Sequence, residues 1–241
     1  MRTDGNELKK LTEIQQMALG FNQRLTGEFG ETYFRVGGNL FLGRFYARSD
    51  RIYFGLNPGS VGENCEFVAR LEDDNGFNQP FRNPEKFNRE FRFGGNWQRF
   101  LEENEELNEW FNNKVTSTFL VPWRTANVRP ELYRLNSNTK GRVFEYSANL
   151  VKKMLEHHNA KVLIICGKAG LHLLNEFLKP GWDYREIEAA WKRQKWQKRC
   201  IQTENSIVVL QIPHFSRGIR RVDRAPFSTW LRRELKPFGC R

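Results

Sequence analysis

The chain has 241 residues, which is long enough to bury a sizeable core and short enough to fold as a single domain. Its 39 Lys and Arg residues outnumber its 28 Asp and Glu residues, and the net charge of +11 favours a polyanionic partner such as nucleic acid over a merely basic solvated surface. No apolar run approaches the roughly 20 residues that span a bilayer, and residues 1–10 carry charges where a signal segment is apolar, so we expect a soluble, cytoplasmic protein without membrane contact.

The four cysteines argue against a metal centre. Cys65, Cys166, Cys200 and Cys240 are scattered along the chain and form no C-x-x-C pair, which is the spacing typical of zinc and iron–sulfur sites. We therefore expect reduced structural thiols, no bound metal and no organic cofactor.

The N-terminal part of the chain is predicted to form a long helix. Within residues 8–29, the apolar side chains Leu11, Ile14, Met17 and Phe21 recur at spacings of three and four. This spacing is typical of an amphipathic helix with one face packed on a core.

Two buried strands and a further helix are predicted in the next part of the chain. Residues 51–56 (RIYFGL) are β-branched and aromatic, and they end at the Asn-Pro-Gly turn of residues 57–59. Residues 63–92 are polar with no stable period, which indicates a long excursion over the surface. Residues 97–111 have helical spacing, and residues 115–121 (VTSTFLV) are typical of a buried strand.

The C-terminal half alternates predicted helices and strands. Helical spacing in residues 142–158 precedes the apolar run VLIIC at residues 162–166. Residues 169–178 are predicted to form another helix, and residues 207–212 (IVVLQI) another strand. A closing helix is expected over residues 224–236.

Four near-continuous apolar strands separated by helices predict a mostly parallel sheet that is covered on both faces. The expected fold is therefore α/β, a single three-layer domain over residues 1–241 with a central four-stranded sheet flanked by helices. Residues 1–50 are expected to be a helical and loop extension packed on this domain. In such a sheet, ligands bind beyond the carboxyl ends of the strands, where loops distant in sequence meet.

The turn after the first predicted strand is one candidate for the site. Gly55 lets the backbone approach a ligand closely, Pro58 stiffens the turn, and Asn57 offers both a hydrogen-bond donor and an acceptor. With Leu56 and Gly59, these residues form motif one, residues 55–59. A G-x-N-P-G turn is also an ordinary way to leave a strand.

The loop after the last predicted strand is the second candidate. His214 follows a proline at the strand end, and Ser216, Arg217, Arg220 and Arg221 supply a hydroxyl and cations suited to phosphate contacts. A lone histidine is usually structural, and with these neighbours a functional and a structural role for His214 are equally well supported.

These segments resemble the uracil-DNA glycosylase superfamily, especially its single-strand-selective and mismatch-specific branches. Their first motif reads GMNPG or GINPG, and residues 55–59 here read GLNPG. Residues 207–218 (IVVLQIPHFSRG) are similar to the strand and HPSPRN-type loop of that family, and residues 162–170 (VLIICGKAG) to the strand and glycine turn between them. The resemblance runs from about residue 51 to the C-terminus and implies the glycosylase fold.

The resemblance implies a monofunctional DNA glycosylase, which hydrolyses an N-glycosidic bond and leaves an abasic site. Asn57 would orient the attacking water, although an amide is not a strong general base. His214 would donate a hydrogen bond to the departing base and stabilise its negative charge. Neither motif contains a lysine for a Schiff base, so no strand cleavage is expected. The enzyme would act as a monomer on a flipped-out base in duplex DNA, or on single-stranded DNA.

Three phenylalanines are candidates for contact with the substrate. In related enzymes an aromatic residue follows motif one by about a dozen or more residues, which suits Phe77 and Phe81. Phe119 falls near the position, within residues 116–123 (TSTFLVPW), where many uracil-removing relatives carry an asparagine that reads uracil. A phenyl ring cannot make those hydrogen bonds. The phenylalanine at this position and the long segment 59–80 together favour a modified pyrimidine as the substrate, such as glucosylated hydroxymethylcytosine of phage DNA. Such a substrate implies a role in antiviral defence.

The loop over residues 216–224 is expected to press on the DNA, with Ile219 or Arg220 as a wedge between bases. Residues 191–199 (WKRQKWQKR) would extend this footprint or form a solvated helix face. Two alternative functions stay open: a uracil-DNA glycosylase of base-excision repair, and a non-catalytic module that binds single-stranded nucleic acid. A nuclease is less well supported because the motifs offer no cluster of carboxylates for magnesium.

Overall fold

The structure is a computed structural model. The described residues are 5–29, 38–39, 49–56, 67–68, 94–112, 115–122, 137–178, 183–188, 196–202, 206–213, 219 and 221–240.

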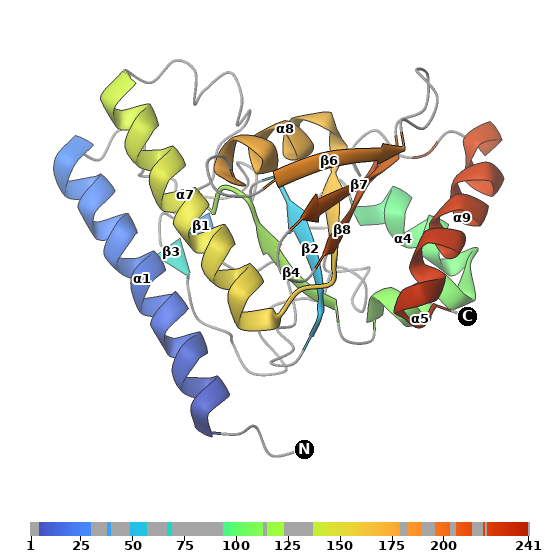
Figure 1. Cartoon of the computed structure of the whole chain (residues 1–241), viewed down its shortest axis with the longest axis horizontal. Coiled ribbons are helices and arrows are strands. Elements are labelled where there is room, and N and C mark those ends of the chain that lie inside the picture. Colours follow the sequence, from blue (N-terminus) through green and yellow to red (C-terminus); the bar gives the residue numbers. More distant parts are fainter. Residues whose placement is uncertain are drawn as a thin grey trace.

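Four parallel strands form the centre of the sheet, in the order β4-β2-β5-β8 (Figure 1). They are β4 (Val115–Phe119), β2 (Arg51–Gly55), β5 (Val162–Cys166) and β8 (Ile207–Ile212). Nearly all of their residues are buried, as expected for parallel strands that are covered on both faces. The predicted α/β fold with a four-stranded parallel sheet flanked by helices is confirmed.

An antiparallel hairpin extends the sheet beyond β8. It consists of β7 (Gln197–Gln202), which pairs with β8, and β6 (Asp183–Glu188) at the edge. The interpretation of residues 191–199 as a helix face was therefore wrong for residues 197–199, which lie in β7. Trp196 is buried, with its ring 5.1 Å from that of Phe227, so this tryptophan packs in the core and does not extend a DNA footprint.

One face of the sheet is covered by α7 (Ser137–His158) and α8 (Gly167–Leu178), and α1 (Gly5–Phe29) packs against α7 (Figure 1). Ile52, Phe54 and Ile165 of the sheet contribute to this core. The rings of Phe21 and Tyr146 stack at 4.2 Å and join α1 to α7. These helices confirm the helices predicted for residues 8–29, 142–158 and 169–178.

The opposite face is covered by α4 (Gly94–Glu102), α5 (Glu105–Asn112) and α9 (Arg221–Leu235), which continues as the 3₁₀ turn η2 (Lys236–Phe238). Aromatic rings fill this second core, with Phe100 and Phe227 5.3 Å apart. The expected closing helix is confirmed.

The single helix expected over residues 97–111 is two helices, α4 and α5, separated at Asn104. The side-chain amide of Asn104 donates a hydrogen bond to the Phe100 carbonyl at 2.7 Å, and its backbone N–H bonds to Leu101. Asparagine competes in this way for backbone groups that would otherwise continue a helix.

A separate two-stranded parallel sheet pairs β1 (Gly38–Asn39) with β3 (Phe67–Val68). Of the predicted excursion over residues 63–92, only β3 is described. Among the described helices, none has the length and apolar character needed to cross a membrane.

Candidate active site

The four parallel strands end level with one another at their carboxyl ends. Gly55 at the end of β2 pairs with Phe119 of β4, and Cys166 at the end of β5 pairs with Ile212 of β8. Phe54 pairs with Ile165, which places Gly55 level with Cys166. The chain thus leaves β2 and β8 at the same edge of the sheet, separated only by β5. Two strand spacings correspond to about 10 Å.

The structure describes only some of the predicted site residues at this edge. Gly55 ends β2 and Leu56 follows it, Phe119 ends β4, and Arg221 opens α9. The other candidates lie outside the described residues; they are Asn57, Pro58, Gly59, Phe77, Phe81, His214, Ser216, Arg217 and Arg220. The described strand ends therefore fix where the two motifs leave the sheet.

One row of side chains at the carboxyl edge faces the same side of the sheet, because residues paired in parallel strands point in the same direction. The row runs Phe119, Gly55, Cys166, Ile212. Gly55 has no side chain, so in this row it separates the phenyl ring of Phe119 from the thiol of Cys166. Tyr53, two residues before Gly55, faces the same side and is buried.

A set of hydrogen bonds connects β2, β5 and the end of β8 through Tyr53, Cys166 and Pro213. Burial, and then the neighbouring Cys166 thiol with which the Tyr53 hydroxyl is hydrogen-bonded, raise the pKa of Tyr53 well above its ordinary value of 10.0. Tyr53 is therefore a neutral hydrogen-bond donor at neutral pH. The Cys166 thiol in turn donates a hydrogen bond to the Pro213 carbonyl at 3.6 Å. Pro213 directly precedes His214 in the sequence.

We call residues 214–220 the motif-two loop. A second set of contacts lies at the far end of this loop. Nε of Arg224 donates a hydrogen bond to the Ile219 carbonyl at 3.5 Å, and Nη1 of Arg224 contacts a Glu103 carboxylate oxygen at 2.7 Å. Ile219 itself packs, partly buried, against the aromatic core under α9. This packing argues against Ile219 as the wedge that inserts between bases.

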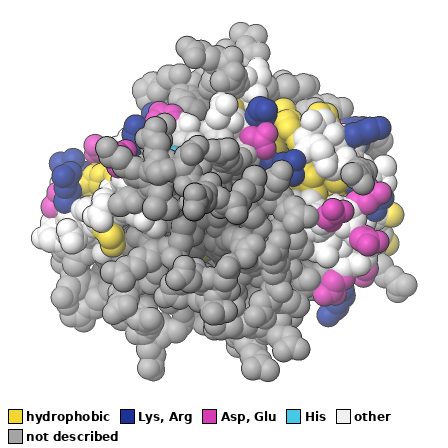
Figure 2. Space-filling model, turned by 90° about the horizontal axis from the view of Figure 1, so that it is seen from below, with side chains coloured by type: hydrophobic (Ala, Val, Ile, Leu, Met, Phe, Trp, Pro, Cys, Tyr) yellow, Lys and Arg dark blue, Asp and Glu magenta, His cyan; other side chains and the backbone are white. Residues whose placement is uncertain are grey.

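Polar contacts join the junction of α4 and α5 to the middle and the later part of α9. Oδ1 of Asn104 accepts hydrogen bonds from Ser228 and from Arg232, the latter at 2.9 Å. Arg232 also lies 3.5 Å from Glu106. Seen from below, basic and acidic side chains are mixed at this end of the molecule (Figure 2). The helix that follows the motif-two loop is thereby held against its neighbours.

Two glycines shape the turn from β5 into α8. Gly167 has φ 72°, a left-handed conformation that side chains other than glycine rarely adopt. At Gly170, an added Cβ would lie 2.9 Å from Cγ2 of Ile165, so only glycine lets α8 approach the sheet this closely. The resemblance pointed to a glycine turn at these positions, and the structure gives the physical reason for both glycines.

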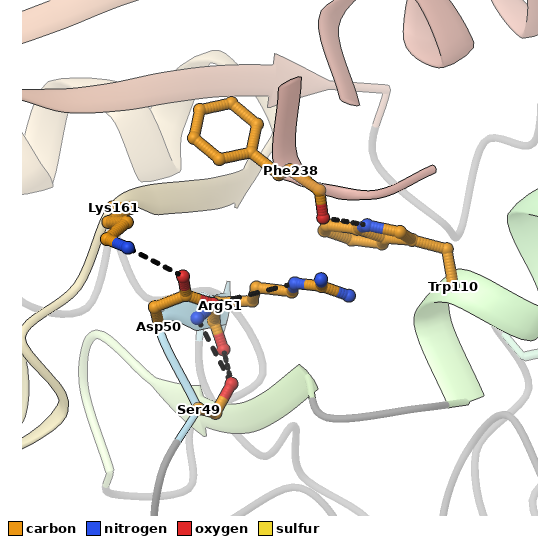
Figure 3. A network of polar contacts seen from close by, with 6 residues as sticks. All are labelled: Ser49, Asp50, Arg51, Trp110, Lys161 and Phe238. Carbon is orange, nitrogen blue, oxygen red and sulfur yellow. Dashed lines mark hydrogen bonds and ion pairs between the residues drawn. The ribbon is translucent and has the colours of Figure 1, made fainter. Parts of the chain in front are cut away.

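The amino ends of the same strands carry a different set of contacts (Figure 3). Asp50 lies 3.6 Å from both the Arg51 guanidinium and the Lys161 ammonium, and Arg51 lies 4.8 Å from the Trp110 ring centre. The Trp110 indole donates a hydrogen bond to the Phe238 carbonyl at 3.1 Å. Burial lowers the pKa of Arg51, and Asp50 opposes this effect. These contacts tie the C-terminal segment to the start of β2.

Sequence reasoning missed the roles of Tyr53 and Cys166 near the predicted site. Cys166 and Cys240 are buried and are not joined in a disulfide, as expected for reduced structural thiols. The available signal was the position of Cys166, because it ends the strand VLIIC at the same edge as both motifs. Within the described part of the chain, no group of three or more His, Cys, Asp or Glu side chains is arranged to hold a metal ion.

Comparison of the chain with models of known protein families finds no match, and comparison with curated proteins finds none either.

Proposed function

We propose that this protein is a monofunctional DNA glycosylase that acts on a flipped-out base. The observation that supports this most strongly is the register of the sheet, because motif one and the motif-two loop leave β2 and β8 at the same edge. A separation of about 10 Å between these two strands leaves room for one nucleotide between groups contributed by the two loops. The net charge of +11 favours a nucleic acid as the partner.

In the proposed reaction, the bond between C1′ of the sugar and the base nitrogen breaks, and its electron pair leaves with the base. His214 stabilises the negative charge by donating a hydrogen bond to an oxygen of the base. Asn57 orients the water that adds to C1′, and the proton of that water passes to solvent. The products are a free base and an abasic site in an intact strand. No metal, cofactor or second subunit takes part in the proposal.

The proposed substrate is a modified pyrimidine, with glucosylated hydroxymethylcytosine of phage DNA as the leading example. Phe119 is 6% exposed and stands directly beside Gly55 on the same face of the sheet. A phenyl ring there supplies an apolar surface and no hydrogen bond to the edge of uracil. This favours antiviral defence over the repair of uracil in DNA.

The proposed DNA contacts come from the motif-two loop and the start of α9. The sequence between β8 and the start of α9 contains Ser216, Arg217, Arg220 and Arg221. Cations that neutralise phosphates release the counterions of the DNA. The affinity of the protein for DNA should therefore fall steeply as salt is added.

The test is to incubate the protein with matched oligonucleotides that carry uracil, hydroxymethylcytosine or glucosylated hydroxymethylcytosine, and to detect free base by mass spectrometry. The variant is Asn57→Ala, and the matched control is Asn138→Ala, which removes an exposed amide on α7. We expect the wild type and the control to release a modified base and Asn57→Ala to release far less. Release of uracil alone would support the repair enzyme, and DNA binding without any release would support the binding module.

A further inference from the structure

We propose that Cys166 is a positioning residue that joins the two halves of the candidate active site. It connects Tyr53, on the strand that leads to motif one, with Pro213, the residue that leads to His214. The proposed consequence for catalysis rests on the glycosylase function described above. The structural part, that Cys166 holds the start of the motif-two loop, does not depend on it.

The position of Cys166 in the sheet makes this link possible. β5 lies between β2 and β8, and Cys166 is its last residue, level with Gly55 on one side and paired with Ile212 on the other. Its side chain is 3% exposed and faces the same side as Tyr53. A single side chain at this point therefore touches both neighbouring strands just where the two motifs begin.

The chemistry of Pro213 explains why a side chain is needed there. Proline has no backbone N–H, so the carbonyl oxygen is the only backbone group through which Pro213 can be hydrogen-bonded. The Sγ atom of Cys166 lies 3.6 Å from that oxygen, a distance suited to the large sulfur atom. Holding this carbonyl restrains the peptide that joins Pro213 to His214.

The direction of the hydrogen bonds follows from the groups involved. The Pro213 carbonyl can only accept, so the thiol must be protonated and donate to it. The sulfur is then left as the acceptor for the Tyr53 hydroxyl, which is protonated at neutral pH as an ordinary tyrosine is, and burial raises its pKa further. Tyr53 thus orients the thiol, and the thiol orients the Pro213 carbonyl.

Cys240 provides a matched control within the same protein. It is also a buried cysteine outside any disulfide, and its thiol also points to a backbone carbonyl, that of Glu106, at 4.0 Å. It belongs to the C-terminal segment, where a Cβ added at the neighbouring Gly239 would lie 3.3 Å from the guanidinium of Arg51, at the amino end of β2. Removing the Cys240 thiol tests for the general cost of losing a buried thiol, away from both motifs.

The experiment compares the wild type with Cys166→Ala, Cys166→Ser, Tyr53→Phe and the control Cys240→Ala. Hydrogen–deuterium exchange is followed by mass spectrometry in peptides that cover residues 213–220. For Cys166→Ala we expect exchange in these peptides to rise about fivefold, the effect of one lost hydrogen bond. Cys166→Ser keeps a donor and should restore much of the protection, Tyr53→Phe should give a smaller increase than Cys166→Ala, and Cys240→Ala should give none.

The same variants are then assayed for base release in single turnover and for DNA affinity. A misplaced His214 slows the chemical step, so we expect Cys166→Ala to lower the rate about tenfold or more while the Kd for DNA changes little. A purely structural role would instead raise exchange throughout the molecule.

The outcomes separate this inference from the proposed function. If the wild type releases a base but Cys166→Ala and Cys240→Ala behave alike, the positioning role is wrong and the glycosylase function stands. If Cys166→Ser behaves like Cys166→Ala, the thiol only fills space and the inference is also overturned. If the wild type releases no base, the glycosylase proposal fails, and the exchange data alone decide whether Cys166 holds the loop.

Discussion

The two ends of the parallel sheet are formed by the same four strands, but they carry different kinds of side chain. At the amino ends, large charged and aromatic side chains such as Arg51 and Trp110 close the edge with contacts to the C-terminal segment (Figure 3). At the carboxyl ends, the side chains are small or neutral, with Gly55 and Cys166 side by side. A phenyl ring, Phe119, stands next to them.

This difference indicates that the two edges of the sheet have different roles. Contacts at the amino-end edge join distant parts of the chain and therefore stabilise the fold. Contacts at the carboxyl-end edge hold backbone carbonyls at the two ends of the motif-two loop, at Pro213 and Ile219. Substitutions at the first edge should change stability, and substitutions at the second should change function.

The largest effect is expected for the two motif residues at the carboxyl edge. Replacing His214 or Asn57 by alanine should lower the single-turnover rate of base release about 100-fold to 1,000-fold, since one positioned donor is worth roughly 3 to 4 kcal/mol. The melting temperature should stay close to that of the wild type. The control His172→Ala, an exposed histidine on α8, should keep the full rate. A His214→Ala protein of normal rate would remove His214 from the mechanism.

Trp110→Leu should have the converse effect at the amino edge. The substitution removes the ring over which Arg51 lies and the indole that bonds to Phe238, and we expect a loss of about 3 kcal/mol in the free energy of unfolding. Trp110→Phe keeps a ring and should cost about 1 kcal/mol. Urea unfolding measures both, and base release per folded molecule should not change. A loss of activity at full stability would contradict the division between the two edges.

A pH-dependent effect is expected for His158, which ends α7 and contacts the backbone of Ser49 near the amino edge. Burial, and then the neighbouring His157, lower the pKa of His158 to about 3. The unfolded chain binds this proton near pH 6.5 and the folded chain does not, so stability falls as the pH falls from 6.5 towards 3. Between pH 7 and pH 5 the loss should be about 2 kcal/mol.

The measurement for His158 is urea unfolding at pH 7, 6 and 5. His158→Gln should flatten the dependence, whereas His172→Gln on the exposed face of α8 should leave it unchanged. Equal slopes for wild type and His158→Gln would mean that the pKa of His158 is the same in the folded and the unfolded protein, and would contradict the effect of burial.

The smallest effect is expected at Gly170, where α8 meets the end of β5. An alanine Cβ would lie 2.9 Å from Ile165, and the resulting shift should cost about 1 to 2 kcal/mol even though alanine favours helices. Gly141→Ala on α7, where a Cβ meets nothing within 4 Å, is the matched control and should stabilise slightly. Thermal unfolding of the two variants compares these sites, and equal melting temperatures would show that α8 can move away from the sheet.

The parallel sheet could be predicted because its strands are short, continuous apolar runs, a pattern typical of strands that are buried on both faces. The hairpin β6–β7 was missed because Asp183–Glu188 and Gln197–Gln202 are polar and highly charged, as edge strands often are. The break at Asn104 was missed because helical spacing continues across it, while the side chain that ends α4 binds a backbone carbonyl.

The candidate site was predictable only in part. Motif one and the motif-two loop stand out in the sequence because both follow strands and carry polar residues at turns. Tyr53 could not be recognised, since it lies inside an apolar run typical of ordinary core, and for Cys166 the one signal was its place at the end of such a run. Their importance emerges only when the order β2-β5-β8 places them next to each other and next to Pro213.

The most direct test of the glycosylase proposal is to follow an end-labelled duplex that carries one glucosylated hydroxymethylcytosine, with and without alkali after incubation. The proposal predicts an intact strand that breaks at the modified position only when alkali is added, because an abasic site has formed. It also predicts that this breakage requires both Asn57 and His214. An alkali-stable strand in the presence of saturating wild-type protein, for this base and for uracil alike, would contradict it.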